Sequence, residues 1–472
     1  MSTPAGGNET LEIRTIEHIP TTERHGRASQ LFTIWFGSNI MLLTIATGLL
    51  GTAIFGLTVT WAIVALVLGN VVGGVVMALH AAQGPQMGVP QMLQTRAQFG
   101  SRGSLLVVVI VVVMYTAFFA SNLVLGGQGV ASLTGLGETL SIVLMGLVSV
   151  LGAVYGYKVI HAMAGLLSVL AGLALLLAFV MAFVVVDLPA ATFSAGDFSW
   201  AGFMSTLSLA ALWQIAYAPY VSDYTRYMPR DTGVRAAFWA TYVGCVLGSL
   251  LPMVLGAVLG AAFPTLDTVG AVREGAGAAG TVVLFVFAFG IAATNSMNLY
   301  CGTLSVLTIG QTLQPRWEPR AGSRAVVAVV IFGFGLALAI LGKGDFLNNF
   351  YNFMLLLLCA LVPWTAVNLV DYYLVRHGDY DISALFRADG GIYGTYNTAA
   401  VCCYALGIAV QVPFLSNALY VGPVADALHG VDVSWIVGLA VISPLYYVWA
   451  RSTRDTGASP GRGRATAGRA DA

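Results

Sequence analysis

The sequence predicts an all-α integral membrane protein with twelve transmembrane helices. Of its 472 residues, 58% are hydrophobic and only 9% are Asp, Glu, Lys or Arg, whereas soluble domains carry roughly 25% charged residues. The mean hydropathy is +0.83, and long apolar runs recur along almost the whole chain. These observations exclude a soluble enzyme. A formal net charge of +0 also excludes nucleic-acid binding through bulk electrostatics.

Each predicted span is a mostly apolar run near the roughly 20 residues that cross a bilayer as a helix. The first run is too long for a signal peptide and lacks a cleavage pattern at its end. The eighth is long enough to be strongly tilted or to extend into the cytoplasm. In chain order, the predicted spans are 31–54, 57–79, 104–130, 139–156, 161–186, 200–226, 235–263, 279–312, 324–342, 346–374, 397–415 and 434–450.

The placement of positive charge supports this count. With twelve spans and cytoplasmic termini, 19 of the 21 Lys and Arg residues fall on the cytoplasmic side, as the positive-inside rule requires. The two exceptions are Arg273 and Lys343. Adding or removing one span would invert every later connection and destroy this asymmetry. We therefore expect a multi-pass protein of the plasma or inner membrane with both termini in the cytoplasm.

Ionisable side chains avoid the centres of the predicted spans. Such charges usually mark proton relays, voltage sensors or sites for charged substrates, so their absence favours an uncharged cargo. The alternative is a carboxylate held by helix dipoles and backbone groups alone. The spans also lack the residue clusters of an enzyme site and the filter motif of a channel. We therefore expect a transporter that has no enzymatic activity and binds no cofactor.

Polar residues nevertheless interrupt several spans. Ser and Thr can bond their own helix and single amides often join helices, so one such residue alone indicates little. The densest group is the run Thr294, Asn295 and Ser296, with Asn298 close behind it. Unpaired amides in hydrocarbon cost several kcal/mol. These side chains must therefore face a cavity or each other.

Two helix breakers occupy comparable positions. Gly37 lies in the first span and Pro219 in the sixth, and these spans correspond if spans 1–5 and 6–10 form two repeats. Transporters with inverted repeats bind substrate where such paired helices unwind. The two breakers are weak evidence alone, because Gly and Pro are common in membrane helices.

Several short segments at the span ends and connections add a more specific signal. They are IEHIP (16–20) with ERHG (23–26) leading into LFTIWF (31–36), GP to Gly88 (84–88) with RAQFG (96–100), SDYTRY (222–227), and VPW (362–364) with DYYLVR (371–376). In these segments the chain resembles the nucleobase:cation symporter-1 family, and within it the purine-cytosine permease branch. The likeness runs in the family's order over about residues 16–400.

The resemblance implies a five-plus-five inverted repeat of the LeuT or APC type, followed by two further helices. Alternating access would then occur around a midplane site between spans 1, 3, 6 and 8. The implied divisions are a cytoplasmic segment 1–30, a first repeat 31–186, a second repeat 200–374, two further spans within 397–450 and a disordered cytoplasmic tail 451–472. The family likeness also implies a monomer.

Carried over by motif, the substrate site would consist of aromatic and amide side chains. A nucleobase is a flat, neutral ring, so aromatic faces can sandwich it by offset stacking. Carboxamides can pair with its edge, and a missing partner in a dry site costs about 1–3 kcal/mol, so the amides would discriminate among bases. The implied substrate-binding residues are Tyr115, Phe118, Trp213, Gln214, Ala216 and Asn295.

The cation site implied by the resemblance has few oxygen ligands. Its carbonyls would come from Gly37 and Ile40 of the first span, and its span-8 positions are Gly290, Ala293 and Thr294. Because Thr294 alone keeps a side-chain oxygen and hard cations prefer several oxygens, the site is depleted for sodium. Proton coupling is the alternative, although no midplane carboxylate carries the proton. The coupling ion stays open between H⁺ and Na⁺, and no metal beyond possible sodium is expected.

The function expected from these features is import of a neutral nucleobase, cytosine or purines, by cation symport. The alternative is another neutral heterocycle on the same fold: allantoin, hydantoin, uracil, pyridoxine or thiamine. Gln214, at a position that is often small or aromatic, could mark such a shift. The expected partners are the nucleobase substrate and the lipid bilayer, without nucleic acid.

Overall fold

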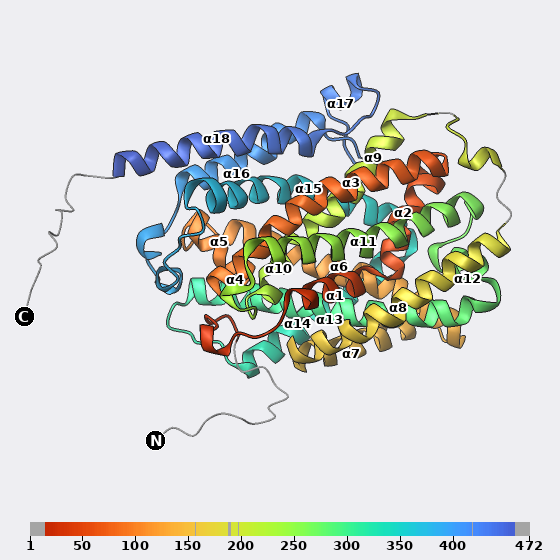
Figure 1. The fold of residues 1–472 in the computed structure, drawn as a ribbon, viewed down its shortest axis with the longest axis horizontal. Helices are drawn as coiled ribbons and strands as arrows, with labels where there is room; N and C mark the ends of the chain where they lie inside the picture. The colour runs from red at the N-terminus through yellow and green to blue at the C-terminus, as the bar shows by residue number, and fades with distance from the viewer. Residues whose placement is uncertain (1–14, 156, 187–189, 197, 418, 458–472) are drawn as a thin grey trace, which may run out of the picture.

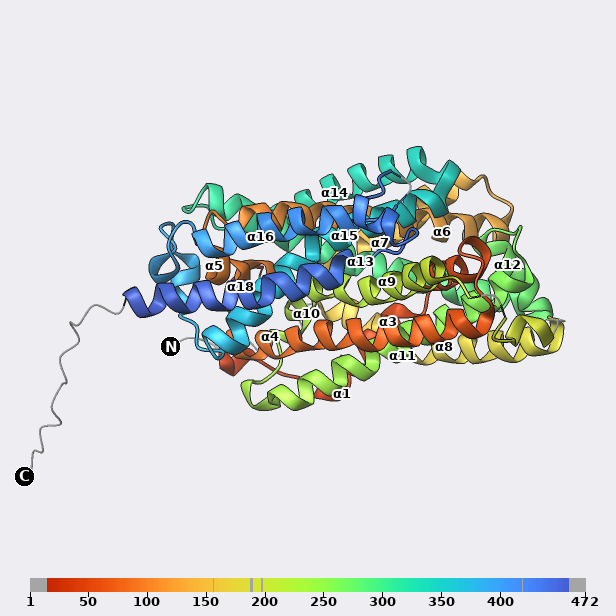
Figure 2. The same cartoon turned by 90° about the horizontal axis from the view of Figure 1, so that it is seen from above.

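A computed structural model describes residues 15–155, 157–186, 190–196, 198–417 and 419–457. Within these ranges the chain is overwhelmingly helical, and the described β-structure is an isolated bridge between Ser416 and Val421. The long helices run side by side along the longest axis of the molecule (Figures 1 and 2). The all-α prediction is therefore confirmed. The predictions for residues 1–14 and 458–472 lie outside the described residues.

The first five predicted spans appear as helices, with the first of them divided in two. Short helices η3, α4 and α5 enter between the second and third spans. The bounds are α1 Ala28–Asn39, α2 Leu42–Leu49, η2 Leu50–Ile54, α3 Val59–Leu79, η3 His80–Ala82, α4 Gln83–Met87, α5 Gln91–Phe99, α6 Leu105–Thr134, α7 Glu138–Tyr155 and α8 Tyr157–Val185.

The next five spans repeat this order, again with a divided first helix and a short helix after the second span. The chain then adds two long helices and a short one between them. The bounds are α9 Trp200–Ala216, α10 Ala218–Thr225, α11 Val234–Ala262, α12 Thr268–Gly275, α13 Gly280–Leu313, α14 Ala321–Gly342, α15 Phe346–Val370, η8 Asp371–Val375, α16 Thr398–Gln411, α17 Pro423–Ala427 and α18 Ser434–Gly457.

The packing of these helices is that of an inverted repeat. The second helix of each unit contacts the divided first helix of the other, because α3 packs along α9 and α11 packs along α1. The third helices, α6 and α13, pack against each other, and α4 and α5 contact α10 as α12 contacts α2. Helices α16 and α18 pack on α15, outside the two units (Figure 1). The expected five-plus-five arrangement with two additional helices is present.

Four glycines bring two helix pairs, α3 with α9 and α11 with α1, into backbone contact; these are called the crossed helix pairs below. Gly69 and Gly73 on α3 face α9, and Gly244 and Gly248 on α11 face α1. A Cβ added at Gly244 would lie 2.7 Å from the carbonyl oxygen of Phe32, closer than side-chain carbons normally approach. The spacing of four residues is the same in both pairs, and small residues allow this close approach in membrane bundles. The second helix of each repeat therefore packs in the same way, through two glycines that are four residues apart.

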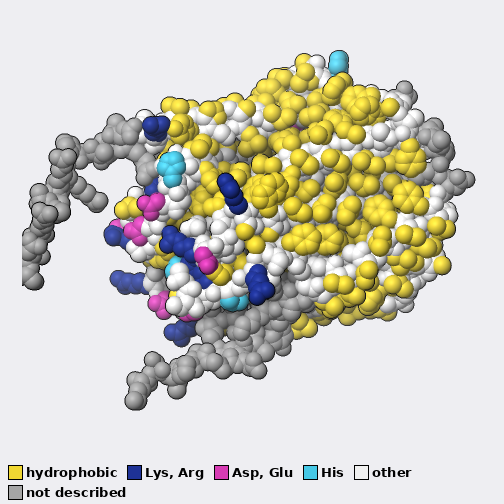
Figure 3. Space-filling view, in the orientation of Figure 1, with side chains coloured by type: hydrophobic (Ala, Val, Ile, Leu, Met, Phe, Trp, Pro, Cys, Tyr) yellow, Lys and Arg dark blue, Asp and Glu magenta, His cyan; other side chains and the backbone are white. Residues whose placement is uncertain are grey.

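Membrane character is visible in helix composition and on the surface. Within the described residues, six helices are long and apolar enough to cross a membrane, or seven if α1 with 42–54 counts as one bent span. Other predicted spans are divided or short: α9 ends at Ala216 before α10, and α16 has 14 residues. Apolar side chains cover most of the face in Figure 3, whereas charged ones gather at one end.

The final helix is longer than predicted. The last span was expected to end at residue 450 and to be followed by a disordered tail, but α18 continues to Gly457. The continuation carries Arg451, whose guanidinium donates to the Tyr447 hydroxyl at 2.8 Å. Polar residues thus extend the helix beyond the apolar run, because a helix can leave the bilayer without ending there.

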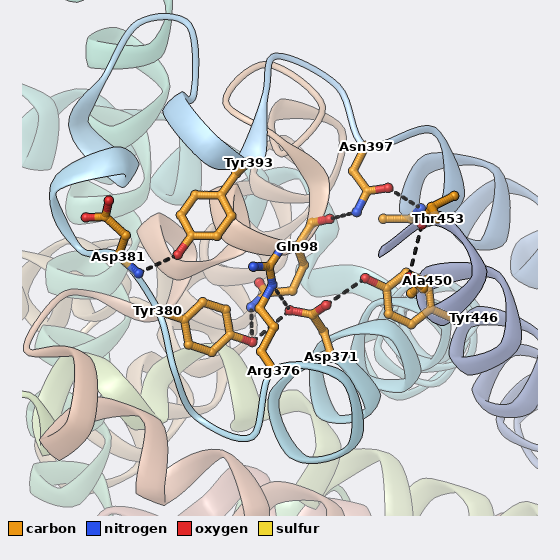
Figure 4. A network of polar contacts seen from close by, with 11 residues as sticks. Gln98, Asp371, Arg376, Tyr380, Asp381, Tyr393, Asn397, Tyr446, Ala450 and Thr453 are labelled. Atoms are coloured by element: carbon orange, nitrogen blue, oxygen red, sulfur yellow. Dashed lines mark hydrogen bonds and ion pairs between the residues drawn. The ribbon is translucent and has the colours of Figure 1, made fainter. Parts of the chain in front are cut away.

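A buried carboxylate joins α18 to the rest of the charged end. Asp371, only 2% exposed, accepts hydrogen bonds from Tyr446 of α18 at 2.9 Å and from Tyr380 at 2.7 Å. Arg376 pairs with the same carboxylate at 3.1 Å (Figure 4). Burial, reinforced by the charge of Asp371, raises the pKa of Tyr380, so its phenol stays protonated and donates. The cluster fastens α18 to η8, at the end of α15.

Candidate functional site

The first span is interrupted between α1 and α2, at a point that is buried among the other helices. Helix α1 ends at Asn39, α2 begins at Leu42, and the two segments are bent by 64°. Ile40 (φ −85°, ψ 87°) and the extended Met41 leave the helical conformation, so the last carbonyls of α1 lose their helical partners. The predicted breaker Gly37 lies inside α1. The break therefore falls three residues later than the sequence indicated.

Helix α13 lies against this break and uses the released carbonyls. The Thr294 hydroxyl is 2.9 Å from the Ser38 carbonyl oxygen and 3.2 Å from that of Gly290. A Cβ added at Gly290 would lie 3.1 Å from the Ile40 carbonyl oxygen. Three residues of the expected cation site, Ile40, Gly290 and Thr294, are thus brought together.

The other two expected cation residues contribute less. Gly37 is buried within α1, and the carbonyl bonded to Thr294 belongs to Ser38 instead. Ala293 is next to Thr294 on α13 and has no side-chain oxygen. The oxygens shown at the junction are therefore two backbone carbonyls of the first span and one hydroxyl of α13.

The sixth span is interrupted differently. Tyr217 separates α9 from α10, but its backbone (φ −83°, ψ −14°) remains in the helical region. The predicted breaker Pro219 is the second residue of α10 and lacks an N–H to continue the helical pattern. Its carbonyl accepts the hydroxyl of Tyr115 at 2.9 Å. The junction therefore releases fewer backbone groups than the break in the first span.

A small enclosed cavity lies between these two junctions, α6 and α13. It holds only about 10 Å³ of free space, about what one water molecule requires. A base can therefore enter only after the walls separate. The cavity is lined by Met41, Phe118, Asn122, Trp213, Ala216, Tyr217, Tyr220, Thr294 and Asn298.

The two predicted stacking rings meet at this cavity in an edge-to-face arrangement. The ring centroids of Phe118 and Trp213 are 6.3 Å apart at an interplanar angle of 84°. The indole Nε1 of Trp213 donates to Asn39 Oδ1 at 2.7 Å, which fixes its orientation. A base stacked on two faces needs about 7 Å between parallel rings, since carbon atoms pack at 3.5–4.0 Å. One ring must therefore turn before the pair can hold a base as a sandwich.

Two carboxamides provide the polar part of the cavity wall. Asn122 is 1% exposed, and its Oδ1 has no hydrogen-bond partner among the described residues. Asn298 accepts the Tyr220 hydroxyl at 2.6 Å and donates to Asn295 Oδ1 at 3.1 Å. An unpaired buried acceptor costs about 1–3 kcal/mol. Asn122 Oδ1 is therefore the open acceptor that a bound ligand can satisfy.

Three of the predicted substrate residues line the cavity and three do not. Phe118, Trp213 and Ala216 lie in its wall. The Tyr115 hydroxyl is committed to Pro219, and Asn295 donates to the Phe119 carbonyl at 3.1 Å. Asn298 lines the cavity where Asn295 was expected, and Asn295 lies behind it as the acceptor of the Asn298 amide. The predicted role of Asn295 in substrate binding stays a prediction.

Gln214 lies outside the cavity lining. Its Nε2 donates to Asn70 Oδ1 and to Ser249 Oγ, each at 2.7 Å. These contacts join α9 to α3 and α11. Its Oε1 has no hydrogen-bond partner among the described residues, so its predicted role in pairing with the base stays a prediction.

Helical spacing could have identified the missing polar residues. Asn122 follows Phe118 by four positions, and Asn298 follows Thr294 by four. Residues separated by four lie on the same helix face, so each predicted cavity residue indicates its neighbour one turn later. Tyr217 and Tyr220 carry the same signal, because they follow the predicted residues Trp213 and Ala216 by four positions and the backbone at Tyr217 stays helical.

Sequence comparisons connect the chain to permeases. Residues 18–438 match the family model described as permease for cytosine/purines, uracil, thiamine, allantoin. YxlA of Bacillus subtilis, whose name assigns it provisionally to the purine-cytosine permeases, is 38% identical over 93% of this chain and 95% of its own. The purine-cytosine permease fcyB of Emericella nidulans is 24% identical, over 91% and 86% of the two chains.

Solved structures share the fold. Mhp1, a nucleobase-cation-symport-1 family transporter, matches in a closed conformation with bromovinylhydantoin bound, with a TM-score of 0.74, 22% identity and coverage of 95% of this chain and 97% of that one. The inward-facing conformation of Mhp1 gives 0.68 at 22% identity, covering 95% and 96%.

Proposed function

The chain belongs to the family of permeases for cytosine/purines, uracil, thiamine and allantoin, and we propose that it imports cytosine or a purine by cation symport. It is an integral membrane transporter of the nucleobase:cation symporter-1 family. We further propose that the charged end in Figure 3 faces the cytoplasm, as the distribution of Lys and Arg indicates.

The composition of the closed cavity carries the substrate proposal. Four aromatic rings, of Phe118, Trp213, Tyr217 and Tyr220, surround it, and its described lining contains no Asp, Glu, Lys, Arg or His. Such a wall suits a flat, uncharged ring, because aromatic faces stack on heterocycles while an ionic ligand would lack a counter-charge.

The two carboxamides supply recognition at the ring edge. Asn122 offers an open acceptor to an N–H donor, and Asn298 keeps one amide hydrogen after donating to Asn295. A ligand with neighbouring donor and acceptor groups satisfies both. Cytosine and the purines carry this pattern, as do allantoin and uracil, which remain the alternative cargo.

The break in the first span supports the coupling part of the proposal. Backbone oxygens of Ser38 and Ile40 approach α13 beside the hydroxyl of Thr294. Oxygen ligands are what a hard cation such as Na⁺ prefers. The described cavity lining has no carboxylate that could carry a proton. The geometry thus favours Na⁺ over H⁺ as the ion to test first.

Uptake of radiolabelled cytosine tests the function. The full chain is expressed in cells that lack their own permeases, first with sodium, then with choline in its place, and then with a protonophore. Saturable uptake that requires sodium supports the complete proposal. Uptake that follows the proton gradient instead would identify H⁺ as the coupling ion. Failure to take up cytosine, with uptake of allantoin or uracil, would move the assignment to the alternative cargo.

A variant of the open acceptor tests the site itself. Asn122→Leu keeps the side-chain size and removes the carboxamide, so the KM for the transported base should rise about tenfold, within the roughly 1–3 kcal/mol of a lost hydrogen bond. The matched control is Asn348→Leu, at an exposed amide near the start of α15. An unchanged KM in Asn122→Leu, at equal surface expression, would remove Asn122 from the site.

A further inference from the structure

A second and larger cavity opens at the charged end of the molecule. Its volume is about 500 Å³ and it shares no residue with the substrate cavity. Three parts of the chain form it: α4, the start of α11 with the turn before it, and η8 with the turn after it. The cavity is lined by Gln86, Arg230, Val234, Tyr372, Tyr373, His377, Gly378 and Asp379.

Hydrogen-bond donors from different elements converge on this cavity. The Arg230 guanidinium donates through Nε to Gln86 Oε1 at 3.1 Å and forms no ion pair with any described residue. The His377 ring donates through Nδ1 to the Tyr373 carbonyl at 2.8 Å, which makes Nε2 of a neutral imidazole an acceptor. Helix α11 begins at Val234 in the cavity wall without a side-chain cap. Arg230 and the start of α11 suit an anion, which helix N-termini and Arg both favour.

The same wall contains a negative charge. Asp379 lines the cavity and is exposed. A simple anion would be repelled by this carboxylate, because like charges at close range are unfavourable. A ligand with a phosphate and an ammonium group separated by a short linker would instead satisfy both signs.

The surroundings of the cavity are those of a membrane interface. One turn beyond Val234 on α11, Phe238 and Tyr242 stack with centroids 5.7 Å apart, and Trp239 is 58% exposed. Exposed aromatic residues of this kind mark the headgroup level of a bilayer. Leu374, next to Tyr373, is 53% exposed. The polar cavity therefore lies beside apolar surface on which acyl chains can pack.

We propose that this cavity binds the headgroup of phosphatidylethanolamine. The phosphodiester occupies the region of Arg230 and the N-terminus of α11, and the primary ammonium pairs with Asp379 and donates to Nε2 of His377. The acyl chains then lie along the surface near Trp239 and Leu374. The site is independent of the substrate cavity, so this assignment does not rest on the transported base.

Native mass spectrometry of the purified full-length protein tests the site. Phosphatidylethanolamine is titrated against phosphatidylcholine, whose methylated ammonium cannot donate hydrogen bonds, and inorganic phosphate is added separately. We expect tighter retention of phosphatidylethanolamine and an affinity about tenfold lower in Arg230→Gln. The matched control is Arg387→Gln, because Arg387 is an exposed residue paired with Asp389 in the following turn. A thermal melt confirms that each variant is folded.

The selectivity of the site is tested by Asp379→Asn. This variant should bind the two lipids almost equally, because the charged partner of the primary ammonium is lost. Equal lipid binding by Arg230→Gln and Arg387→Gln would overturn the proposal. The lipid would then adhere only to the apolar surface of the protein. Displacement of the lipid by inorganic phosphate at equal concentration would also overturn it, because the cavity would then be a site for soluble anions.

Discussion

The breaks in the first and sixth spans occupy equivalent places in the two repeats but present different chemical groups. Between α1 and α2 the chain bends by 64° and its carbonyls face α13. Between α9 and α10, Tyr217 keeps helical backbone angles, and Trp213, Tyr217 and Tyr220 line the cavity. One break exposes main-chain oxygens, and the other directs aromatic side chains.

This difference separates two tasks within one symmetric scaffold. Main-chain oxygens are available whatever the side chain, so the first break can bind an ion with little sequence signal. Recognition of a heterocycle depends on ring faces and amides, so the second break is defined by its side chains. Under the proposed function, ion coupling lies at the first break and substrate binding at the second.

The largest expected effect comes from removing the hydroxyl that α13 contributes to the first break. Thr294→Val deletes the donor to the Ser38 carbonyl and removes a potential cation ligand. We expect uptake to fall about 100-fold, equivalent to roughly 3 kcal/mol. Thr294→Ser retains the hydroxyl and should stay within about threefold of the parent. The measurement is initial uptake rate against sodium concentration, and parental uptake by Thr294→Val would show that the first break has no coupling role.

An intermediate effect is expected at the second break. Trp213→Ala removes an aromatic wall of the cavity, and stacking on a base is worth roughly 1–3 kcal/mol, so KM should rise about tenfold or more. Trp213→Phe should recover much of this loss. The dependence of uptake on the coupling ion is measured in parallel. A shift in ion dependence as large as that of Thr294→Val would contradict the division of tasks between the two breaks.

The smallest effect is expected for Pro219→Ala. The carbonyl that accepts the Tyr115 hydroxyl is retained, and the interruption of the helix lies at Tyr217. We therefore expect a change in KM and maximal rate of about twofold or less, because alanine fits the helical backbone of α10 without strain. A loss of more than about fivefold would show that the missing N–H of Pro219 itself creates the junction.

Much of the fold could be predicted from the sequence, because apolar runs and the bias of Lys and Arg are properties of whole segments. The exact break in the first span could not. Gly37 is the residue with the weakest local helix preference, yet α1 continues past it. The chain departs from the helix at Ile40 and Met41, where Thr294 and Thr44 bond the preceding carbonyls. Only the tertiary contacts identify that position.

The candidate site was only partly predictable for a related reason. Of the predicted substrate residues, Phe118, Trp213 and Ala216 lie in the cavity wall, whereas Gln214 turns toward Asn70 and Ser249. Helices that are apolar on all sides carry little information about which face meets which neighbour. The direction of a buried amide in such a helix depends on its partners elsewhere in the chain.

The glycines of the crossed helix pairs have a mechanical consequence. Gly69 and Gly73 fix α3 against α9, and Gly244 and Gly248 fix α11 against α1. Since there is no space for even a methyl group, these helices cannot slide along one another without steric overlap. The four helices α1, α3, α9 and α11 therefore form one rigid unit. Helices α6 and α13 form the other side of the cavity. Under the proposed function, the four helices would move as one rigid unit relative to α6 and α13 when the ligand binds or leaves.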